Sequence, residues 1–188
     1  MSFFPLYLTM DSKKVLLIGA GSIATHKLEK LLDFTQDISI ISLKVSKEAQ
    51  KLISQNELRF YQRAYQSGDI EGFDIVIIAT EDEVLHQEIY EESRGLGILV
   101  NSVDNMKYCD FIFPSYIQKG DLTVAFSTGG ASPAFAKKIR QHFEKHIPHN
   151  VGAFLTQMKA LRSTLPKGKA RIQYFDSLVS NYFNIFFK

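Results

Sequence analysis

The chain has 188 residues, of which 45% are apolar and 22% are charged, and its formal net charge is +2. These values are typical of a globular protein with one α/β domain and a small appendage. The charge is too small to indicate nucleic acid or an anionic membrane as a partner. The single cysteine, Cys109, excludes an intrachain disulfide and a multi-cysteine metal site.

The start of the chain, Met1 to Leu8, lacks a basic leader, so no signal peptide is expected. No stretch reaches the roughly 18 uninterrupted apolar residues of a membrane span. We therefore expect a cytoplasmic protein with neither a membrane nor a nucleic acid as partner.

Short apolar runs alternate with helical spacing through the first part of the chain. Strands are expected at 4–8 (an edge strand), 14–18, 38–41, 58–61, 73–79 and 98–100. Helices are expected at 23–32, 48–54 and 83–94. Such alternation predicts βαβ units, and hence an α/β fold with a Rossmann-type, mainly parallel sheet.

The pattern changes near Phe113. Residues 115–118 and 122–127 predict a hairpin, and Ser132 with Pro133 begins a helix that runs to about His146. Residues 151–161 and 170–187 predict two more helices, the last with an aromatic stripe that packs on another helix or a partner subunit. This gives a Rossmann domain at 1–113, a small dimerisation segment at 114–148 and a C-terminal helical region at 149–188.

A glycine-rich turn follows the strand that ends at Ile18. The run from Gly19 to Ala24 matches G-x-G-x-x-A and precedes a helix, which is the context that dinucleotide binding requires. The first glycine permits a tight turn, and the second lets the backbone approach the pyrophosphate at the helix N-terminus. Cofactor contacts are therefore expected from Gly19, Gly21, Ser22 and Ile23.

The second strand lacks the usual acidic residue for the adenosine ribose. It is expected to end in Ser42-Leu43-Lys44, where Ser42 can hydrogen-bond a ribose hydroxyl. Lys44 is either a partner for a 2′-phosphate or a solvated lysine, so the residues alone do not decide between NAD and NADP.

Two other strand ends should share the crevice, because ligands bind beyond the carboxyl ends of such sheets. Thr80 follows one strand and either contacts the cofactor or caps a helix. Asn101 and Asp104 follow the next. Asp104 is either a catalytic carboxylate or a turn residue.

Together these motifs resemble the precorrin-2 dehydrogenase/siroheme synthase family. The resemblance rests on residues 4–8, 15–21, 79–82 and 100–104, and most specifically on 110–114 followed by 127–133 and Ala136. It ends near Pro148.

The resemblance implies NAD-dependent oxidation of precorrin-2 to sirohydrochlorin, with Asp104 as the catalytic residue. It also implies a homodimer formed through about 115–148, and a tetrapyrrole substrate held by Thr128, Gly129, Gly130 and Ser132. Some relatives further insert ferrous iron as ferrochelatases. His86 stands where relatives often carry asparagine, which leaves a cofactor contact at that position open.

Two other functions remain open at the level of sequence. One is a non-catalytic module that senses NAD(H) and needs only the glycine turn. The other is a chelatase that acts without a dehydrogenation step.

Overall fold

The computed structural model describes residues 3–187 and divides the chain into two compact units. The N-terminal unit spans Phe4–Ile112, and the unit called C-terminal here comprises Phe3 and the chain from Phe113 onward. The change of pattern expected near Phe113 therefore coincides with this division. The separate region expected at 149–188 stays a prediction.

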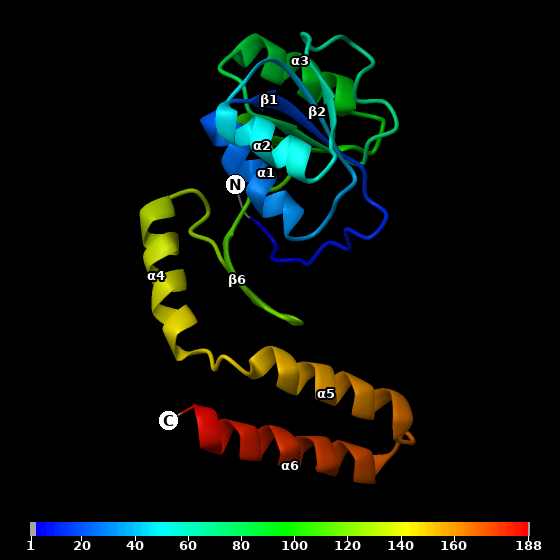
Figure 1. Cartoon of the computed structure of the whole chain (residues 1–188), viewed down its shortest axis with the longest axis vertical. Helices are drawn as coiled ribbons and strands as arrows, with labels where there is room; N and C mark the ends of the chain where they lie inside the picture. Colours follow the sequence, from blue (N-terminus) through cyan, green and yellow to red (C-terminus); the bar gives the residue numbers. More distant parts are fainter. Residues whose placement is uncertain (1–2, 188) are drawn as a thin grey trace. The chain divides into compact units, whose positions relative to one another are not determined.

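A five-stranded parallel sheet forms the centre of the N-terminal unit. Its strand order is β3-β2-β1-β4-β5. The strands are β1 (Val15–Ala20), β2 (Ile38–Val45), β3 (Arg59–Tyr61), β4 (Ile75–Ile78) and β5 (Leu99–Ser102). The helices are α1 (Ser22–Leu32), α2 (Lys47–Gln55) and α3 (Glu83–Ser93), with a 3-10 turn at Met106–Tyr108. Helices α1 and α2 pack side by side (Figure 1). The predicted Rossmann-type parallel sheet is confirmed.

The central strand shows why these residues fold in this way. All six residues of β1 are buried, because the strand pairs with β2 on one side and with β4 on the other. An uninterrupted apolar run is what a parallel strand covered on both faces requires. Leu16, Ile18, Val76 and Val100 belong to one core cluster, which joins β1, β4 and β5. This order places the carboxyl ends of β1 and β4 side by side, at the point where the strand order reverses.

Two expectations about strands were wrong. Residues 4–8 form no strand: Pro5 has no N–H to donate to a ladder, and the side chain of Phe4 is 83% exposed. β5 (Leu99–Ser102) begins one residue later and ends two residues later than expected, so it includes Asn101, which pairs with Ile77 of β4. Strand ends depend on such pairing as well as on the apolar run.

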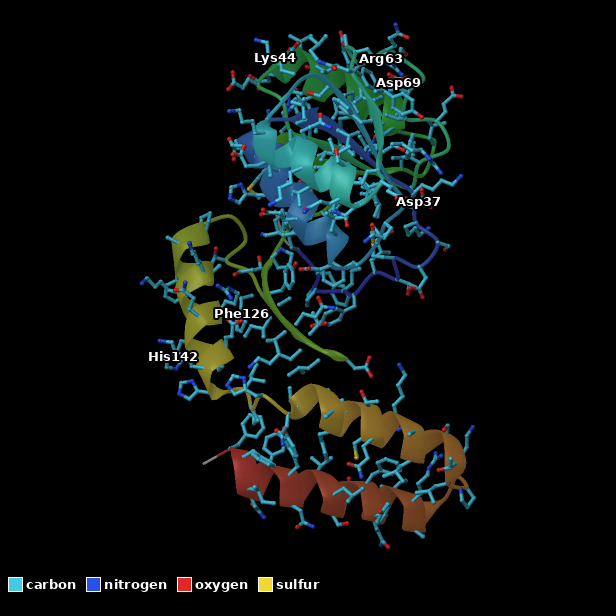
Figure 2. The ribbon with its side chains drawn as sticks, in the orientation of Figure 1. Asp37, Lys44, Arg63, Asp69, Phe126 and His142 are labelled. Atoms are coloured by element: carbon cyan, nitrogen blue, oxygen red, sulfur yellow. The ribbon has the colours of Figure 1, made fainter. Side chains whose placement is uncertain are left out.

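The C-terminal unit begins with the predicted hairpin. Strands β6 (Ser115–Lys119) and β7 (Leu122–Phe126) are antiparallel, and helices α4 (Pro133–His146), α5 (Val151–Thr164) and α6 (Lys169–Phe186) follow. The Ser132 hydroxyl accepts the N–H of Phe135 at 3.2 Å, which confirms the expected cap of α4. Phe126 of β7, labelled in Figure 2, stacks on Phe143 of α4.

Aromatic side chains join the last two helices. The ring of Tyr182 in α6 lies 4.0 Å from that of Phe154 in α5, and its hydroxyl donates to Asn150 at 2.7 Å. The expected packing of the aromatic stripe on a neighbouring helix is confirmed for Phe175 and Tyr182, which are buried. None of the described helices is both long enough and apolar enough to cross a membrane.

Candidate cofactor and active site

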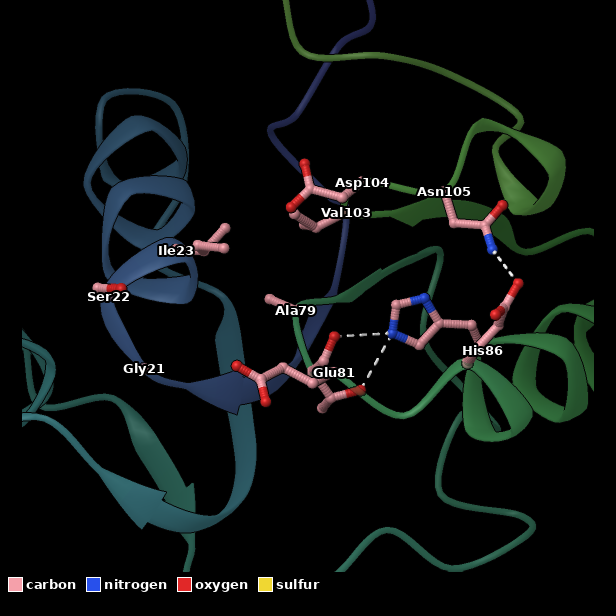
Figure 3. Close-up of a pocket in the computed structure, with 11 residues that line it drawn as sticks. Gly21, Ser22, Ile23, Ala79, Glu81, His86, Val103, Asp104 and Asn105 are labelled. Carbon is pink, nitrogen blue, oxygen red and sulfur yellow. Dashed lines mark hydrogen bonds between the residues drawn. The ribbon is translucent and has the colours of Figure 1, made fainter.

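A pocket of about 510 Å³ lies within the N-terminal unit, at the carboxyl ends of its central strands. Three segments form its wall: the start of α1, the turn between β4 and α3, and the loop after β5 (Figure 3). Its volume falls in the range of ligand sites, about 300–1,000 Å³. The lining residues are Gly21, Ser22, Ile23, Ala79, Thr80, Glu81, Glu83, His86, Val103, Asp104 and Asn105.

The two glycines of the turn have different surroundings. Gly19 has φ +104°, and a Cβ there would collide with the carbonyl oxygen of Ala79. Gly21 precedes α1 with φ −81°, and a Cβ there would meet nothing within 4 Å. Gly19 thus lets β1 and the end of β4 approach each other, whereas Gly21 leaves open space beside the N-terminus of α1.

The start of α1 offers the binding chemistry expected of this turn. The N–H groups of the first helical residues, Ser22 and Ile23, cannot bond within the helix and are available to an anion. Ala24 behind them is 1% exposed, so its small side chain allows α1 to pack closely on the sheet. Gly21, Ser22 and Ile23 all line the pocket, as the sequence led us to expect.

Thr80 also lines the pocket, and another residue caps the helix that follows. The carboxylate of Asp82 accepts the N–H groups of Val84 and Leu85 at 3.1 and 3.2 Å and so caps α3. The hydroxyl of Thr80 instead lies 3.1 Å from Nε2 of His86.

His86 is the lining residue whose role the sequence did not reveal. Its side chain is 4% exposed and hydrogen-bonds through both ring nitrogens. Nδ1 lies 2.6 Å from the Ser102 hydroxyl, and Nε2 lies 3.1 Å from both the hydroxyl and the carbonyl oxygen of Thr80. The ring therefore links the β4 turn to the end of β5. Its spacing from Thr80 was visible in the sequence, but its contact with Ser102, sixteen positions away, was not.

Asp104 lies in the loop after β5 with φ +61°, a left-handed conformation that Asp tolerates better than most residues. The loop is fixed at its base, where the N–H of Val103 donates to Ile78 at 2.9 Å. The thiol of Cys109 accepts the N–H of Ser102 at 3.3 Å and donates to the Ser102 carbonyl at 3.1 Å. Burial raises the pKa of this thiol, which favours the neutral form that can donate.

Lys27 of α1 places a cationic group near this loop. Burial, together with repulsion from Lys30, lowers the pKa of Lys27 to about 8. Attraction to Cys109 and Asp104 partly offsets that decrease.

Three residues expected to contact the cofactor, Gly19, Asn101 and Ser42, are not among those that line the pocket. Asn101 is buried within β5, and its amide donates to the carbonyl of Phe111 at 2.8 Å. Ser42 does not end its strand, because β2 continues past a register shift to Val45, and its hydroxyl donates to the carbonyl of Lys44 at 2.7 Å. The side chain of Lys44 is exposed (Figure 2).

The four expected substrate contacts belong to the C-terminal unit. Gly129 and Gly130 have positive φ, and the Thr128 hydroxyl accepts the N–H of Ser132 at 3.0 Å. Their part in binding stays a prediction.

Comparison with known proteins gives the family. Residues 6–115, more than half of the chain, match a family model described as NAD(P)-binding. The chain belongs to this NAD(P)-binding family. Residues 119–146 match a second model, the central region of a sirohaem biosynthesis protein.

Similar proteins confirm the resemblance to siroheme synthases. The siroheme synthase of Methylococcus capsulatus is 32% identical over 94% of this chain and 38% of the relative. That of Actinobacillus pleuropneumoniae serotype 7 is 28% identical over 96% of this chain and 38% of the relative. The chain thus spans little more than a third of the length of the curated relatives it matches.

A solved structure shares the fold. The protein named SirC, precorrin-2 dehydrogenase, has a TM-score of 0.77 and 23% identity, covering 90% of this chain and 85% of that one.

Proposed function

We propose that this protein oxidises precorrin-2 to sirohydrochlorin with NAD as the hydride acceptor. The observation that carries the proposal is the position of Asp104, whose carboxylate lines the same pocket as the N-terminus of α1 that follows the glycine turn. Membership of the NAD(P)-binding family and the siroheme synthase relatives favour this reaction over other dehydrogenations. The choice of NAD over NADP follows the resemblance.

Different residues of the pocket would bind the cofactor and accept the proton. The open space beside Gly21 and the N–H groups of Ser22 and Ile23 suit a pyrophosphate. When bound, the nicotinamide ring supplies the site that takes up a hydride. Asp104 accepts the proton, so precorrin-2 loses one hydride and one proton, and the products are sirohydrochlorin, NADH and H⁺.

The C-terminal unit contains the residues proposed to bind the substrate and to form a dimer. The hydroxyls of Thr128 and Ser132 and the backbone N–H of Gly130 suit the carboxylates of a tetrapyrrole, and a Cβ at Gly129 would meet nothing within 4 Å. We propose a homodimer formed through about 115–148, where α4 exposes large apolar side chains: Phe135 is 59% exposed and Phe143 is 47% exposed. Burial of these rings against a second copy would stabilise the pair.

The test is an anaerobic incubation of the full chain with precorrin-2 and either NAD⁺ or NADP⁺. Absorbance measures the reduced dinucleotide and sirohydrochlorin as they form. NADH formed together with sirohydrochlorin, and faster with NAD⁺, is the expected result. Binding of the dinucleotide without turnover would instead favour the sensing module. Iron insertion into supplied sirohydrochlorin, with no dehydrogenation, would favour a chelatase.

A further inference from the structure

The contacts of His86 determine which of its ring nitrogens carries the proton. Nε2 lies 3.1 Å from the carbonyl oxygen of Thr80, and a carbonyl can only accept. Nε2 must therefore hold a hydrogen in this arrangement. Nδ1 lies 2.6 Å from the Ser102 hydroxyl, which can either donate or accept. The hydrogen on Nε2 is assigned from the hydrogen-bond network.

The same N–H constrains the hydroxyl of Thr80. That oxygen also lies 3.1 Å from Nε2 and accepts a share of the same hydrogen (Figure 3). Its own hydrogen must then point elsewhere, and Thr80 lines the pocket. The hydroxyl thus keeps its own hydrogen to donate, whereas an isolated threonine hydroxyl rotates freely between donating and accepting.

We infer that His86 is a positioning residue that makes Thr80 a hydrogen-bond donor to an oxygen of the bound dinucleotide. The inference rests on the cofactor site of the proposed function. The buried ring also ties Thr80 to Ser102, two residues before Asp104. One side chain thereby sets the spacing between the turn that contacts the cofactor and the loop that carries the carboxylate.

Two amide substitutions separate positioning from a general structural role. A glutamine amide nitrogen reaches about as far as Nε2 of histidine, whereas asparagine is shorter and reaches only about as far as Nδ1. His86→Gln therefore keeps the donor to Thr80, and His86→Asn loses it. The partner substitution is Thr80→Val, which removes the hydroxyl and keeps the shape of the side chain, with Thr80→Ser as its control.

Thermal unfolding first shows that each variant folds. Each variant is then titrated by isothermal calorimetry with NAD⁺ or NADP⁺, whichever the unmodified chain binds more tightly. His86→Asn and Thr80→Val should each weaken binding about three- to tenfold, the loss of one hydrogen bond. His86→Gln and Thr80→Ser should stay within about twofold. The double variant His86→Asn/Thr80→Val should be no weaker than Thr80→Val alone, because both changes remove the same contact.

Additive losses in the double variant would overturn the inference, and so would equal losses in His86→Gln and His86→Asn. Absence of binding by the unmodified chain to either dinucleotide would also overturn it. Binding with the expected coupling but no oxidation of precorrin-2 would contradict only the proposed function.

Discussion

Asp104 is the residue on which the chemistry depends. Asp104→Asn removes the negative charge and tolerates the same left-handed conformation, φ +61°, so the loop should keep its shape. The rate of NADH formation from precorrin-2 should fall about 10²–10⁴-fold, the usual contribution of a positioned proton acceptor. Affinity for NAD⁺, measured by titration calorimetry, should change little. A variant that turns over at the normal rate would remove Asp104 from the mechanism.

The glycines of the turn allow a matched comparison. Gly19→Ala places a methyl group against the carbonyl of Ala79 at positive φ, so the free energy of unfolding should fall by about 1–3 kcal/mol from backbone strain alone. Gly21→Ala meets open space and should leave stability nearly unchanged, while NAD⁺ affinity falls by about tenfold. Chemical denaturation and calorimetry measure the two quantities. If both variants changed both quantities alike, the distinction between the glycines would be wrong.

Residues that a local motif singled out lie together in the structure, and their roles in binding and catalysis stay predictions. Gly21, Ser22, Ile23, Thr80 and Asp104 all line one pocket. Asn101 and Ser42 did not follow, because their positions depend on where β5 and β2 end, and those ends are set by pairing with β4 and β1. The contact of His86 with Ser102 could not be predicted, because the two residues lie sixteen positions apart in the sequence.

Lys27 of helix α1 lies in surroundings that disfavour its positive charge. Burial and Lys30 lower the pKa of Lys27 from its ordinary value of 10.5 to about 8. Between these values the folded chain holds fewer protons than the unfolded chain, so stability should rise with pH across that window. Lys27→Met should therefore stabilise the protein at pH 7, and the gain should shrink as the pH rises from about 8 toward 10.5.

Denaturation curves at several pH values check this prediction. Lys51→Met, an exposed lysine on α2, is the control, because it removes the same formal charge without the burial. A gain from Lys27→Met that stayed constant with pH, or that Lys51→Met shared, would contradict the account.

At the level of elements, sequence periodicity located every α-helix and every strand of the described residues, and it also predicted one strand, at 4–8, that does not form. The failure at residues 4–8 has a simple cause: a short apolar run forms a strand only where a partner strand is present. The extension of β2 to Val45 had no local signal either, because it follows a register shift against β1.

At the scale of the whole molecule, the sequence predicted a change of architecture near Phe113. The parallel βαβ logic ends near Phe113, and the hairpin, the capped helix and the two further helices all form within the C-terminal unit. The reaction itself could not be derived from periodicity or spacing. It came from the resemblance, and the family comparison supports the nicotinamide cofactor.

The most direct test of the central claim is the stoichiometry of one anaerobic reaction. The full chain is mixed with a known amount of precorrin-2 and excess NAD⁺, and NADH and sirohydrochlorin are both quantified, with Asp104→Asn run in parallel. The account predicts equal amounts of the two products from the unmodified chain and a much slower reaction from the variant. Sirohydrochlorin without NADH, or neither product from a folded chain that binds NAD⁺, would contradict it.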